Sequence, residues 1–190
     1  LEQGRKLRAL ALDKTGTITV GRPTLTDQRA FVATDHTTLF RRAASLAGRS
    51  DHPVSSAVAT HWSTQFPEQQ LLDVDAVESL TGRGIKGVIN GELAYLGNHR
   101  LVEELGICSP ALETILTAFE NDGKTTVVLC SVQAPQLVIA VADTIRDTSI
   151  AAIEDLESLG IHVVMLTGDN PHTAAAIARQ SGIADARGNL

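Results

Sequence analysis

Two apolar blocks, one near each end of the chain, stand out in the pattern of hydrophobic and polar positions. Short, mainly apolar runs at residues 6–12 and 161–166 predict buried parallel strands. The first run stops at Thr15–Thr17 and the second at Thr167–Asn170, both of which contain glycine and threonine. A buried strand that ends in such a loop is typical of a functional site at the carboxyl end of a parallel sheet.

Helical patterns flank the second of these strands. Apolar side chains recur at helical spacing over residues 147–159, and Gly160 follows them. Pro171 suits the first turn of a further helix that runs to about residue 181. Helix, strand and helix in this order form half of a doubly wound α/β layout. The two ends of the chain therefore predict an α/β unit.

The middle of the chain has a different pattern. Asn90-Gly91 between two short apolar runs predicts a tight hairpin. The predicted strands cover residues 25–32, 72–80, 85–89, 93–96, 125–130 and 137–141. The predicted helices cover residues 37–47, a stretch from 53 onward, 100–105 and 110–121. We therefore predict that residues 24–142 form an α+β domain, inserted into a βαβ frame that residues 1–23 and 143–190 supply.

Composition narrows the class of protein. With 190 residues the chain can form one large core or two small ones, and an aromatic content of 3% predicts aliphatic cores. A net charge of −6 without a run of Lys and Arg argues against a nucleic-acid partner. Cys108 and Cys130 lack CxxC spacing and have no paired histidines nearby, so we predict buried free thiols and no zinc site.

The apolar stretches are too short to cross a membrane. Leu137–Ala142 is an example of the longest stretches, and a spanning helix needs about 20 residues. The sequence has no signal peptide and opens on Leu-Glu-Gln-Gly without Met, so we expect an excised segment. If the parent is a membrane protein, we expect its membrane part to lie outside this chain, which itself makes no membrane contact.

Asp13 is the candidate nucleophile. Its carboxylate can attack phosphorus without losing a proton and would form an aspartyl phosphate. Lys14 and Thr167 would offset or hydrogen-bond the phosphoryl charge, aided by the backbone N–H groups of Thr15 and Gly16. Mg²⁺ would bind the Asp13 carboxylate and a nearby backbone carbonyl. The alternative is an exposed turn at the first loop and a helix N-cap at the second.

These loops resemble the motifs of a known family. Asp13–Thr19 reads Asp-Lys-Thr-Gly-Thr-Ile-Thr and resembles the phosphorylation signature of P-type ATPases. Met165–Asn170 resembles the second phosphate-site motif of the same family. The resemblance covers essentially the whole chain. It implies a partial haloacid dehalogenase-like (Rossmannoid) P domain, truncated at its C-terminal side, with an inserted nucleotide-binding N domain whose antiparallel sheet is flanked by helices.

The resemblance also implies roles for individual residues. The catalytic residues that it implies are Asp13, Lys14, Thr15, Thr167, Gly168 and Asp169, and the implied Mg²⁺ ligands are Asp13 and Thr15. Phosphatases of the haloacid dehalogenase-like superfamily carry a second Asp two positions after the nucleophile, as acid and base. Thr15 takes that position here, so the phosphoenzyme is expected to persist, as a pump requires.

His52 is the first candidate for a nucleotide site. By itself, a histidine ahead of Pro53 is more often a helix cap or a surface residue. Ser50–Pro53 resembles, however, the motif that marks the heavy-metal (P1B) branch, in which the histidine supports adenine. That branch usually has Glu five residues before the histidine, where this chain has Ala47. Either Asp51 or another acid takes over that contact, or the base is held more loosely.

Two glycine motifs follow. Thr81–Gly87 matches G-x-G-x-x-G, but a hairpin and not a helix follows, so we reject a dinucleotide-binding fold. Gly82 and Gly84 mark either a bulge at a strand junction or a close approach of backbone to the nucleotide, as in the family. Gly97-Asn98 resembles a pair of the same branch, and without the family it would be a strand end and a helix cap.

Asp143 and Arg146 lie where the chain re-enters the frame. They resemble the Asp-x-x-Arg hinge segment of the family, whose charges can reach the nucleotide during domain closure. A helix N-cap with an exposed arginine explains the same residues equally well. Both interpretations stay open.

The expected ligands are ATP or ADP and Mg²⁺, and the expected partners are the transmembrane and actuator domains of a parent pump. We expect the parent to lie in a cell membrane, with this region cytoplasmic, in the bacterial inner membrane. The resemblance favours zinc, cadmium or lead as the transported metal and leaves copper open. The family's catalytic lysine and Gly-Asp-Gly loop are absent, so we expect nucleotide binding with little or no turnover. A soluble phosphatase and a nucleotide-sensing module are the rival functions.

Overall fold

The structure is a computed structural model that describes residues 7–189, and the chain separates into two compact units. The first unit is formed by both ends of the chain, up to Pro23 and from Asp143 onward, together with Glu120–Lys124. The second unit comprises Thr24–Phe119 and Thr125–Ala142. These limits coincide with the predicted domain limits, except that the segment 120–124 groups with the first unit.

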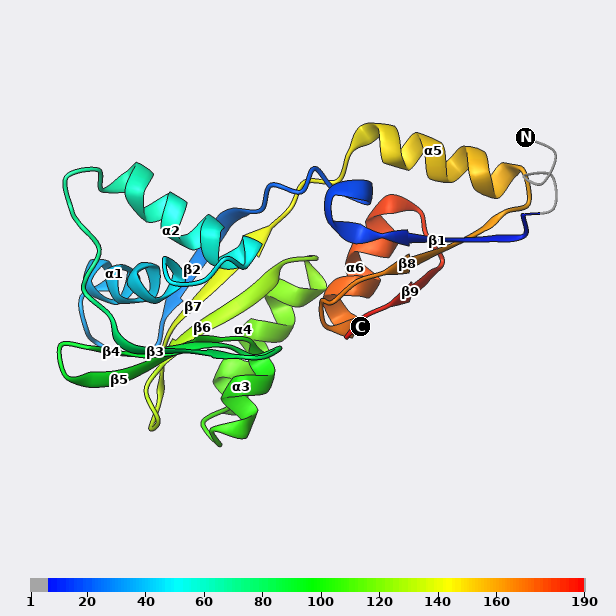
Figure 1. Cartoon of the computed structure of the whole chain (residues 1–190). Helices are drawn as coiled ribbons and strands as arrows, with labels where there is room; N and C mark the ends of the chain where they lie inside the picture. Colours follow the sequence, from blue (N-terminus) through cyan, green and yellow to red (C-terminus); the bar gives the residue numbers. More distant parts are fainter. Residues whose placement is uncertain (1–6, 190) are drawn as a thin grey trace. The chain divides into compact units, whose positions relative to one another are not determined.

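The first unit is a parallel three-stranded sheet with two helices (Figure 1). The strand order is β1-β8-β9, and both pairs are parallel. The strands are β1 (Ala9–Asp13), β8 (His162–Leu166) and β9 (Asp185–Arg187), and the helices are α5 (Asp147–Ser158) and α6 (Pro171–Ser181). Strand β9 was not predicted, because three residues are too few for a periodic pattern. Its pairing with β8 completes a βαβ unit around α6.

An aliphatic core holds this unit together. Val163 and Met165 of β8 are fully buried, and they lie in one cluster with Ile153 of α5 and Ile177 of α6. Val164 between them and Leu166 after them are only partly buried. Alternation along β8 therefore directs the apolar side chains toward the core, and the polar loops remain at the end of the strands.

The second unit is a six-stranded antiparallel sheet with helices on both faces (Figure 1). The strand order is β2-β7-β6-β5-β4-β3. The strands are β2 (Thr24–Ala30), β3 (Asp75–Leu80), β4 (Gly84–Ile89), β5 (Glu92–Gly97), β6 (Thr125–Cys130) and β7 (Pro135–Ala142). The helices are α1 (His36–Ala47), α2 (Pro53–Gln65), α3 (His99–Glu104) and α4 (Pro110–Asn121). The predicted antiparallel sheet with flanking helices is confirmed.

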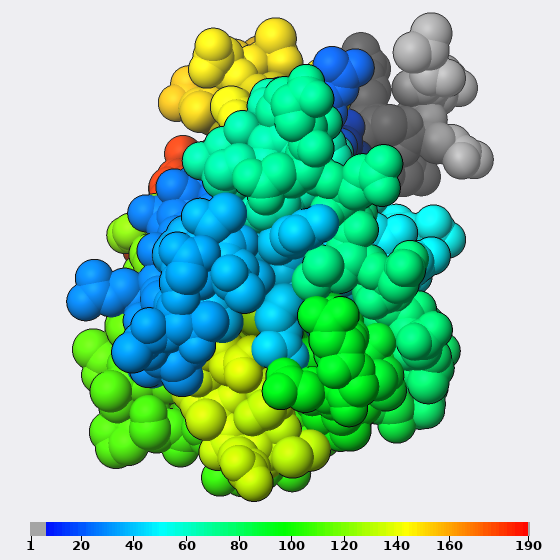
Figure 2. Space-filling view, turned by 90° about the vertical axis from the view of Figure 1, so that its left-hand side faces the viewer, coloured from blue at the N-terminus to red at the C-terminus, as the bar shows by residue number. Residues whose placement is uncertain are grey.

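Each face of this sheet has its own core. Leu129 of β6 packs in the cluster that contains α1 and α2, whereas its neighbours Val128 and Cys130 pack in the cluster that contains α3 and α4. This division follows from the period of two along a strand. Helix α1 contacts β4 and β5, and Figure 2, which views the end of this unit, shows α1 in light blue beside the green hairpin.

The β4–β5 hairpin has the turn that the sequence predicts. Asn90 and Gly91 have φ angles of +53° and +80°, as the twist of a two-residue hairpin requires. The register that follows from this turn pairs Ile89 with Glu92 at one end of the hairpin and Gly84 with Gly97 at the other. Among residues 7–189, no helix has the length and the apolar content to cross a bilayer.

Candidate functional site

The two polar loops predicted from the sequence lie side by side in the first unit. Strands β1 and β8 pair in parallel, and Asp13 is opposite Leu166 in the register. The residue after Leu166 is Thr167, so both loops leave the same edge of the sheet. Asp13 is exposed there, whereas Lys14 and Thr167 are 9% and 5% exposed. The edge therefore presents one accessible carboxylate next to buried polar groups.

Asp169 interacts with both buried polar groups of this edge, Lys14 and Thr167. The Lys14 ammonium forms an ion pair with Asp169 Oδ2 at 2.5 Å, and both side chains are nearly buried. Thr167 Oγ1 donates to the same oxygen at 3.0 Å and accepts from the Asp169 N–H at 3.1 Å. Gly168, exposed between them, has no side chain to cover the loop. The arrangement places a fixed cation and a fixed hydroxyl at the end of the strand that bears Asp13.

The loop after Asp13 folds around the Thr19 hydroxyl. A helical turn, η2 (Lys14–Ile18), contains Gly16 at φ +76°. The Gly16 N–H donates to Thr19 Oγ1 at 3.3 Å, and this hydroxyl donates in turn to Asp143 Oδ2 at 2.6 Å. In this structure the Gly16 N–H is therefore already engaged by Thr19, and its assistance to a phosphoryl group stays a prediction.

Asp143 and Arg146 fasten this loop to the start of α5. The Asp143 carboxylate accepts from the backbone N–H groups of Gly21 and Arg22 at 3.0–3.1 Å, in addition to the Thr19 hydroxyl. The Arg146 guanidinium donates to the Thr19 and Val20 carbonyls at 2.9 and 3.2 Å. Arg146 occupies the N-cap position of α5, but its side chain does not cap the helix. In this structure both charges therefore position the loop that carries Asp13.

Sequence reasoning missed Thr19, although its side chain is central to this loop. Thr19 is fully buried, and its partner Asp143 lies 124 positions further along the chain. No local pattern identifies such a pair, because a threonine in a glycine-containing loop is ordinary turn chemistry. The isolated bridge between Thr19 and Ile145 brings these two segments together, and it exists only in the folded chain.

Replacing Asp143 by Asn is expected to destabilise the first unit by about 1–3 kcal/mol. Hydrogen bonds to a carboxylate are stronger than those to a neutral amide, and the NH₂ group of Asn would face a donor in place of one carboxylate oxygen. Thermal unfolding of the 190-residue chain measures the effect. Asp155→Asn, at an exposed position of α5, is the matched control and should leave the midpoint within the error. Equal midpoints for both variants would contradict this role of Asp143.

The glycine motifs of the second unit meet at one end of the β4–β5 hairpin. Gly84 pairs with Gly97, and Asn98 follows directly. The Asn98 side-chain amide donates to the Gly82 carbonyl at 2.9 Å, and the Asn98 N–H donates to the Arg83 carbonyl at 2.8 Å. Asn98 also caps α3 by accepting from the Leu101 N–H at 3.2 Å. These contacts hold the two motifs in one compact corner.

The three glycines of this corner, Gly82, Gly84 and Gly97, are required for different structural reasons. A Cβ atom at Gly84 would lie 2.2 Å from the Leu96 carbonyl oxygen, and one at Gly97 would lie 2.6 Å from the Arg83 carbonyl oxygen. Both positions therefore need glycine because two backbone segments of this chain lie close together there. This agrees with the interpretation of a strand junction. Gly82 has φ +67° and open space around its missing Cβ. Gly82 and Gly84 are both exposed, whereas Gly97 is buried.

His52 begins helix α2. Its Nδ1 accepts from the Val54 N–H at 3.3 Å, so the neutral ring carries its proton on Nε2. The residue is exposed, as a helix cap commonly is. Val54 packs in the same core cluster as Ile85 and Leu96, which adjoin Gly84 and Gly97. One core therefore anchors the segments that carry the histidine and the glycine motifs.

Ala47 is fully buried at the end of α1 and belongs to the same core cluster. The position therefore has apolar surroundings. Asp51 is exposed beside His52. Replacement of the missing glutamate by Asp51 or by another acid, and a more loosely held base, therefore stay the alternatives.

The comparison with protein families covers nearly the whole chain. Residues 7–189 match the haloacid dehalogenase-like hydrolases. The chain belongs to this family. A parallel sheet with an aspartate at the end of β1 and a threonine-containing loop at the end of β8 is the part of the structure that corresponds to the predicted frame. The predicted membership is confirmed.

The curated relatives of this haloacid dehalogenase-like chain are longer proteins. A copper-transporting P-type ATPase of Rhizobium leguminosarum bv. viciae is 37% identical over 190 residues, which is all of this chain and 22% of the relative. A cadmium-transporting ATPase of Staphylococcus aureus is 37% identical over 194 residues, which is all of this chain and 27% of the relative. The chain thus spans about a quarter of the length of these relatives.

Two solved structures resemble this haloacid dehalogenase-like chain over its whole length. A zinc-transporting PIB-type ATPase in an E2·Pi state matches with a TM-score of 0.67 and 30% identity, and the match covers 30% of that protein. The catalytic domain of the CPx-ATPase CopB-B matches with a TM-score of 0.72 at 18% identity and covers 64% of that protein. The second likeness, at its low identity, concerns the fold alone.

Proposed function

We propose that this chain is the nucleotide-binding and phosphorylation region of a heavy-metal cation-transporting P-type ATPase, in which Asp13 accepts the γ-phosphoryl group of ATP. The observation that carries the proposal is the edge at which exposed Asp13 lies beside the Lys14–Asp169 ion pair and the Thr167 hydroxyl. The family match and the names of the relatives support it.

The chain's own residues would act by position and charge. Asp13 supplies the attacking oxygen as a carboxylate, and no base is needed to activate it. The Lys14 ammonium would stabilise charge on the phosphoryl oxygens, while Asp169 keeps it in place. Thr167 would donate its hydroxyl proton to a phosphoryl oxygen in place of Asp169. Asp169 holds both groups near Asp13, so only the Thr167 hydroxyl has to change its partner for the transfer.

The donor atoms at this edge are of the type that Mg²⁺ prefers. The Asp13 carboxylate and the Thr15 carbonyl are hard oxygen ligands, which Mg²⁺ prefers. Thr15 is exposed and has an extended backbone (φ −78°, ψ 120°), so its carbonyl belongs to an open loop. When bound, the ion would neutralise charge between the transferred phosphoryl group and Asp13.

For ATP or ADP, we propose a site to which His52 and the corner of Gly82 and Asn98 both contribute, since Val54 beside His52 shares a core cluster with Ile85 and Leu96. The exposed His52 ring offers a stacking face and an Nε2–H donor to adenine. The open backbone at Gly82 permits close approach of the ligand. Gly84, Gly97 and Asn98 then act as the support of that corner.

Replacing His52 by Asn is expected to weaken ATP binding about tenfold, because a base stacked on an aromatic ring is worth about 1–3 kcal/mol. Asn is a preferred N-cap residue, so α2 keeps its cap while the ring is lost. Calorimetric titration of the 190-residue chain measures the affinity. Gly82→Val should weaken binding as well, by filling the open approach.

Gly91→Val is the matched control for Gly82→Val. Gly91 also has a positive φ of 80° and open space around its missing Cβ, but it lies in the turn at the opposite end of the hairpin. The two variants carry the same backbone strain. If both weaken ATP binding equally, or if the His52 variant binds as tightly as the parent chain, the proposed nucleotide site is wrong.

We further propose that the parent protein is a membrane-embedded pump of bacterial inner membranes and that this region is its cytoplasmic part, which works with transmembrane and actuator domains. The motif resemblance favours Zn²⁺, Cd²⁺ or Pb²⁺ as the cargo, and copper is the alternative. The relatives named for copper and for cadmium have the same 37% identity, so identity does not favour either. Metal-dependent ATPase activity of the full-length protein tests the choice.

A further inference from the structure

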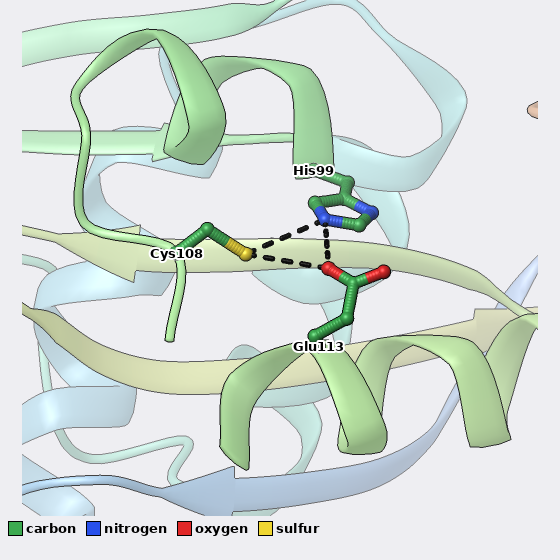
Figure 3. Close-up of side chains that lie close together, drawn as sticks. All are labelled: His99, Cys108 and Glu113. Atoms are coloured by element: carbon green, nitrogen blue, oxygen red, sulfur yellow. Dashed lines mark hydrogen bonds and ion pairs between the residues drawn. The ribbon is translucent and has the colours of Figure 1, made fainter. Parts of the chain in front are cut away.

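Three side chains capable of binding a metal meet between α3 and α4 of the second unit. Figure 3 shows His99, the first residue of α3, Cys108 of the connecting loop and Glu113 of the first turn of α4. Cys108 Sγ lies 3.5 Å from His99 Nε2 and 3.4 Å from Glu113 Oε2. His99 Nε2 and Glu113 Oε2 are 2.7 Å apart. All three atoms therefore converge on one point.

Contacts other than those of the cluster fix the backbone that carries it. The Asn98 side chain caps α3, and the Ser109 hydroxyl accepts from the Leu112 N–H at 3.2 Å at the start of α4. Cys108 packs against the core cluster that contains the fully buried Leu112. The positions of the cluster are therefore set by helix caps and by the core.

The distances are those of a tetrahedral site with one edge compressed. Zinc bonds of about 2.3 Å to sulfur and about 2.0–2.1 Å to nitrogen and oxygen, at tetrahedral angles, separate sulfur from either atom by about 3.5 Å and nitrogen from oxygen by about 3.3 Å. The two distances from Cys108 Sγ already have this value. Only Glu113 has to withdraw from His99, by about 0.6 Å on these bond lengths. Its side chain is 50% exposed and free to do so.

The donor set selects the kind of cation. A thiolate, an imidazole and a carboxylate together carry two negative charges and suit Zn²⁺ and its heavier relative Cd²⁺, whereas Mg²⁺ and Ca²⁺ prefer oxygen ligands alone. Three protein ligands leave a fourth position for water. The half-exposed Glu113 carboxylate, beside the 21% exposed His99 side chain, gives the cation a path from solvent.

A reactive cysteine is the competing interpretation of the same residues. Partial burial, followed by the hydrogen bond to Glu113, raises the pKa of the Cys108 thiol to about 11. A thiol with so high a pKa is a poor nucleophile at neutral pH, so redox or covalent chemistry is disfavoured. A bound cation would take the place of the thiol proton, as it does at zinc–thiolate sites generally.

We propose that His99, Cys108 and Glu113 form a binding site for Zn²⁺ or Cd²⁺ that is separate from the phosphorylation edge. The proposal does not depend on the proposed function, because it rests on the donor atoms and their distances alone. It adds a metal site to the second unit, for which the proposed function requires only nucleotide.

Titration of the reduced 190-residue chain with Cd²⁺, without nucleotide, tests the site. We expect one equivalent to bind and to produce the ultraviolet charge-transfer absorption of a cadmium–thiolate bond. Cys108→Ser should abolish this absorption, and His99→Gln and Glu113→Gln should each weaken binding by about tenfold or more. His36→Gln, at an exposed position in α1, is the control and should bind Cd²⁺ like the parent chain.

Two results would overturn the proposal. The first is an absence of charge-transfer absorption in the parent chain, in which case the three residues form only a hydrogen-bonded cluster. The second is absorption that persists in Cys108→Ser, which would assign the metal to Cys130. If Cys108→Ser does not fold, the half-exposed Glu113→Gln decides the matter, because it alters the site without opening the core. Cd²⁺ affinity of Glu113→Gln equal to that of the parent chain then rejects the site.

Discussion

Replacing Asp13 by Asn is expected to abolish the formation of an acid-stable phosphoenzyme in the proposed full-length transporter. The amide has nearly the shape of the carboxylate, so β1 and its pairing with β8 are retained. It lacks the charged oxygen that attacks phosphorus, however, and the phosphoryl bond cannot form. Incubation with ATP labelled at the γ-phosphate, followed by acid quenching, measures the protein-bound label. Binding of ATP in the second unit should stay unchanged.

Asp155→Asn serves as the control for this experiment, because it makes the same change at an exposed position of α5. It should retain the phosphoenzyme level of the parent protein. Labelling of the Asp13→Asn protein above background would contradict the role of Asp13. In the 190-residue chain alone we expect nucleotide binding with little or no turnover, and rapid turnover that Asp13→Asn abolishes would contradict that expectation.

Replacing Thr15 by Asp is expected to shorten the life of the phosphoenzyme by about 10²–10⁴-fold, the usual range of general acid–base catalysis. Thr15 is exposed, two residues after Asp13, and has no ionisable group. A carboxylate there could take a proton from the water that attacks the phosphoaspartate. The decay of label after a chase with unlabelled ATP, with and without ADP, measures the rate of hydrolysis.

Thr17→Asp is the matched control for this variant. It adds the same charge at an exposed position of the same loop, two residues further from the nucleophile. Faster hydrolysis in Thr15→Asp alone would support an acid–base role of the introduced carboxylate. Equal acceleration in both would indicate a general effect of charge or of loop disorder, and unchanged decay in Thr15→Asp would remove Thr15 as the cause of a long-lived phosphoenzyme. A soluble phosphatase, the rival function, would hydrolyse phosphomonoesters without either substitution.

Patterns local in the sequence predicted most of the framework. The strand at residues 162–166 and the Asn90-Gly91 turn depend on neighbouring residues, and the structure confirms both. The predicted burial of the two parallel strands is wrong for β1, in which no residue is buried, and holds only for alternate residues of β8. Parallel strands bring their carboxyl ends to one edge, so the neighbourhood of Asp13 and Thr167 followed from strand type alone. Strand β9 escaped prediction, because its pairing with β8 and not its three-residue sequence makes it a strand.

The sequence therefore determined the residue types that meet at one sheet edge: an aspartate, a lysine and a threonine. Only the tertiary structure decided which groups are engaged. The ion pair of Lys14 with Asp169 joins residues 155 positions apart in the chain, and the Thr19–Asp143 contact spans 124 positions. Such pairs produce no periodic pattern in the sequence, because the fold of the chain, and not a fixed spacing of residues, brings them together.

Cys108 also shows which features the sequence determines and which the tertiary structure decides. Its isolated position in the sequence predicted a buried free thiol without metal-binding neighbours, and the prediction of burial is wrong, whereas that for Cys130 is confirmed. His99 and Glu113 reach Cys108 only because two short helices pack on the same sheet face with their first turns together. The sequence by itself determined the helices, since their caps and periodicity are local. The meeting of their side chains was decided by the packing of α3 and α4 against the shared core.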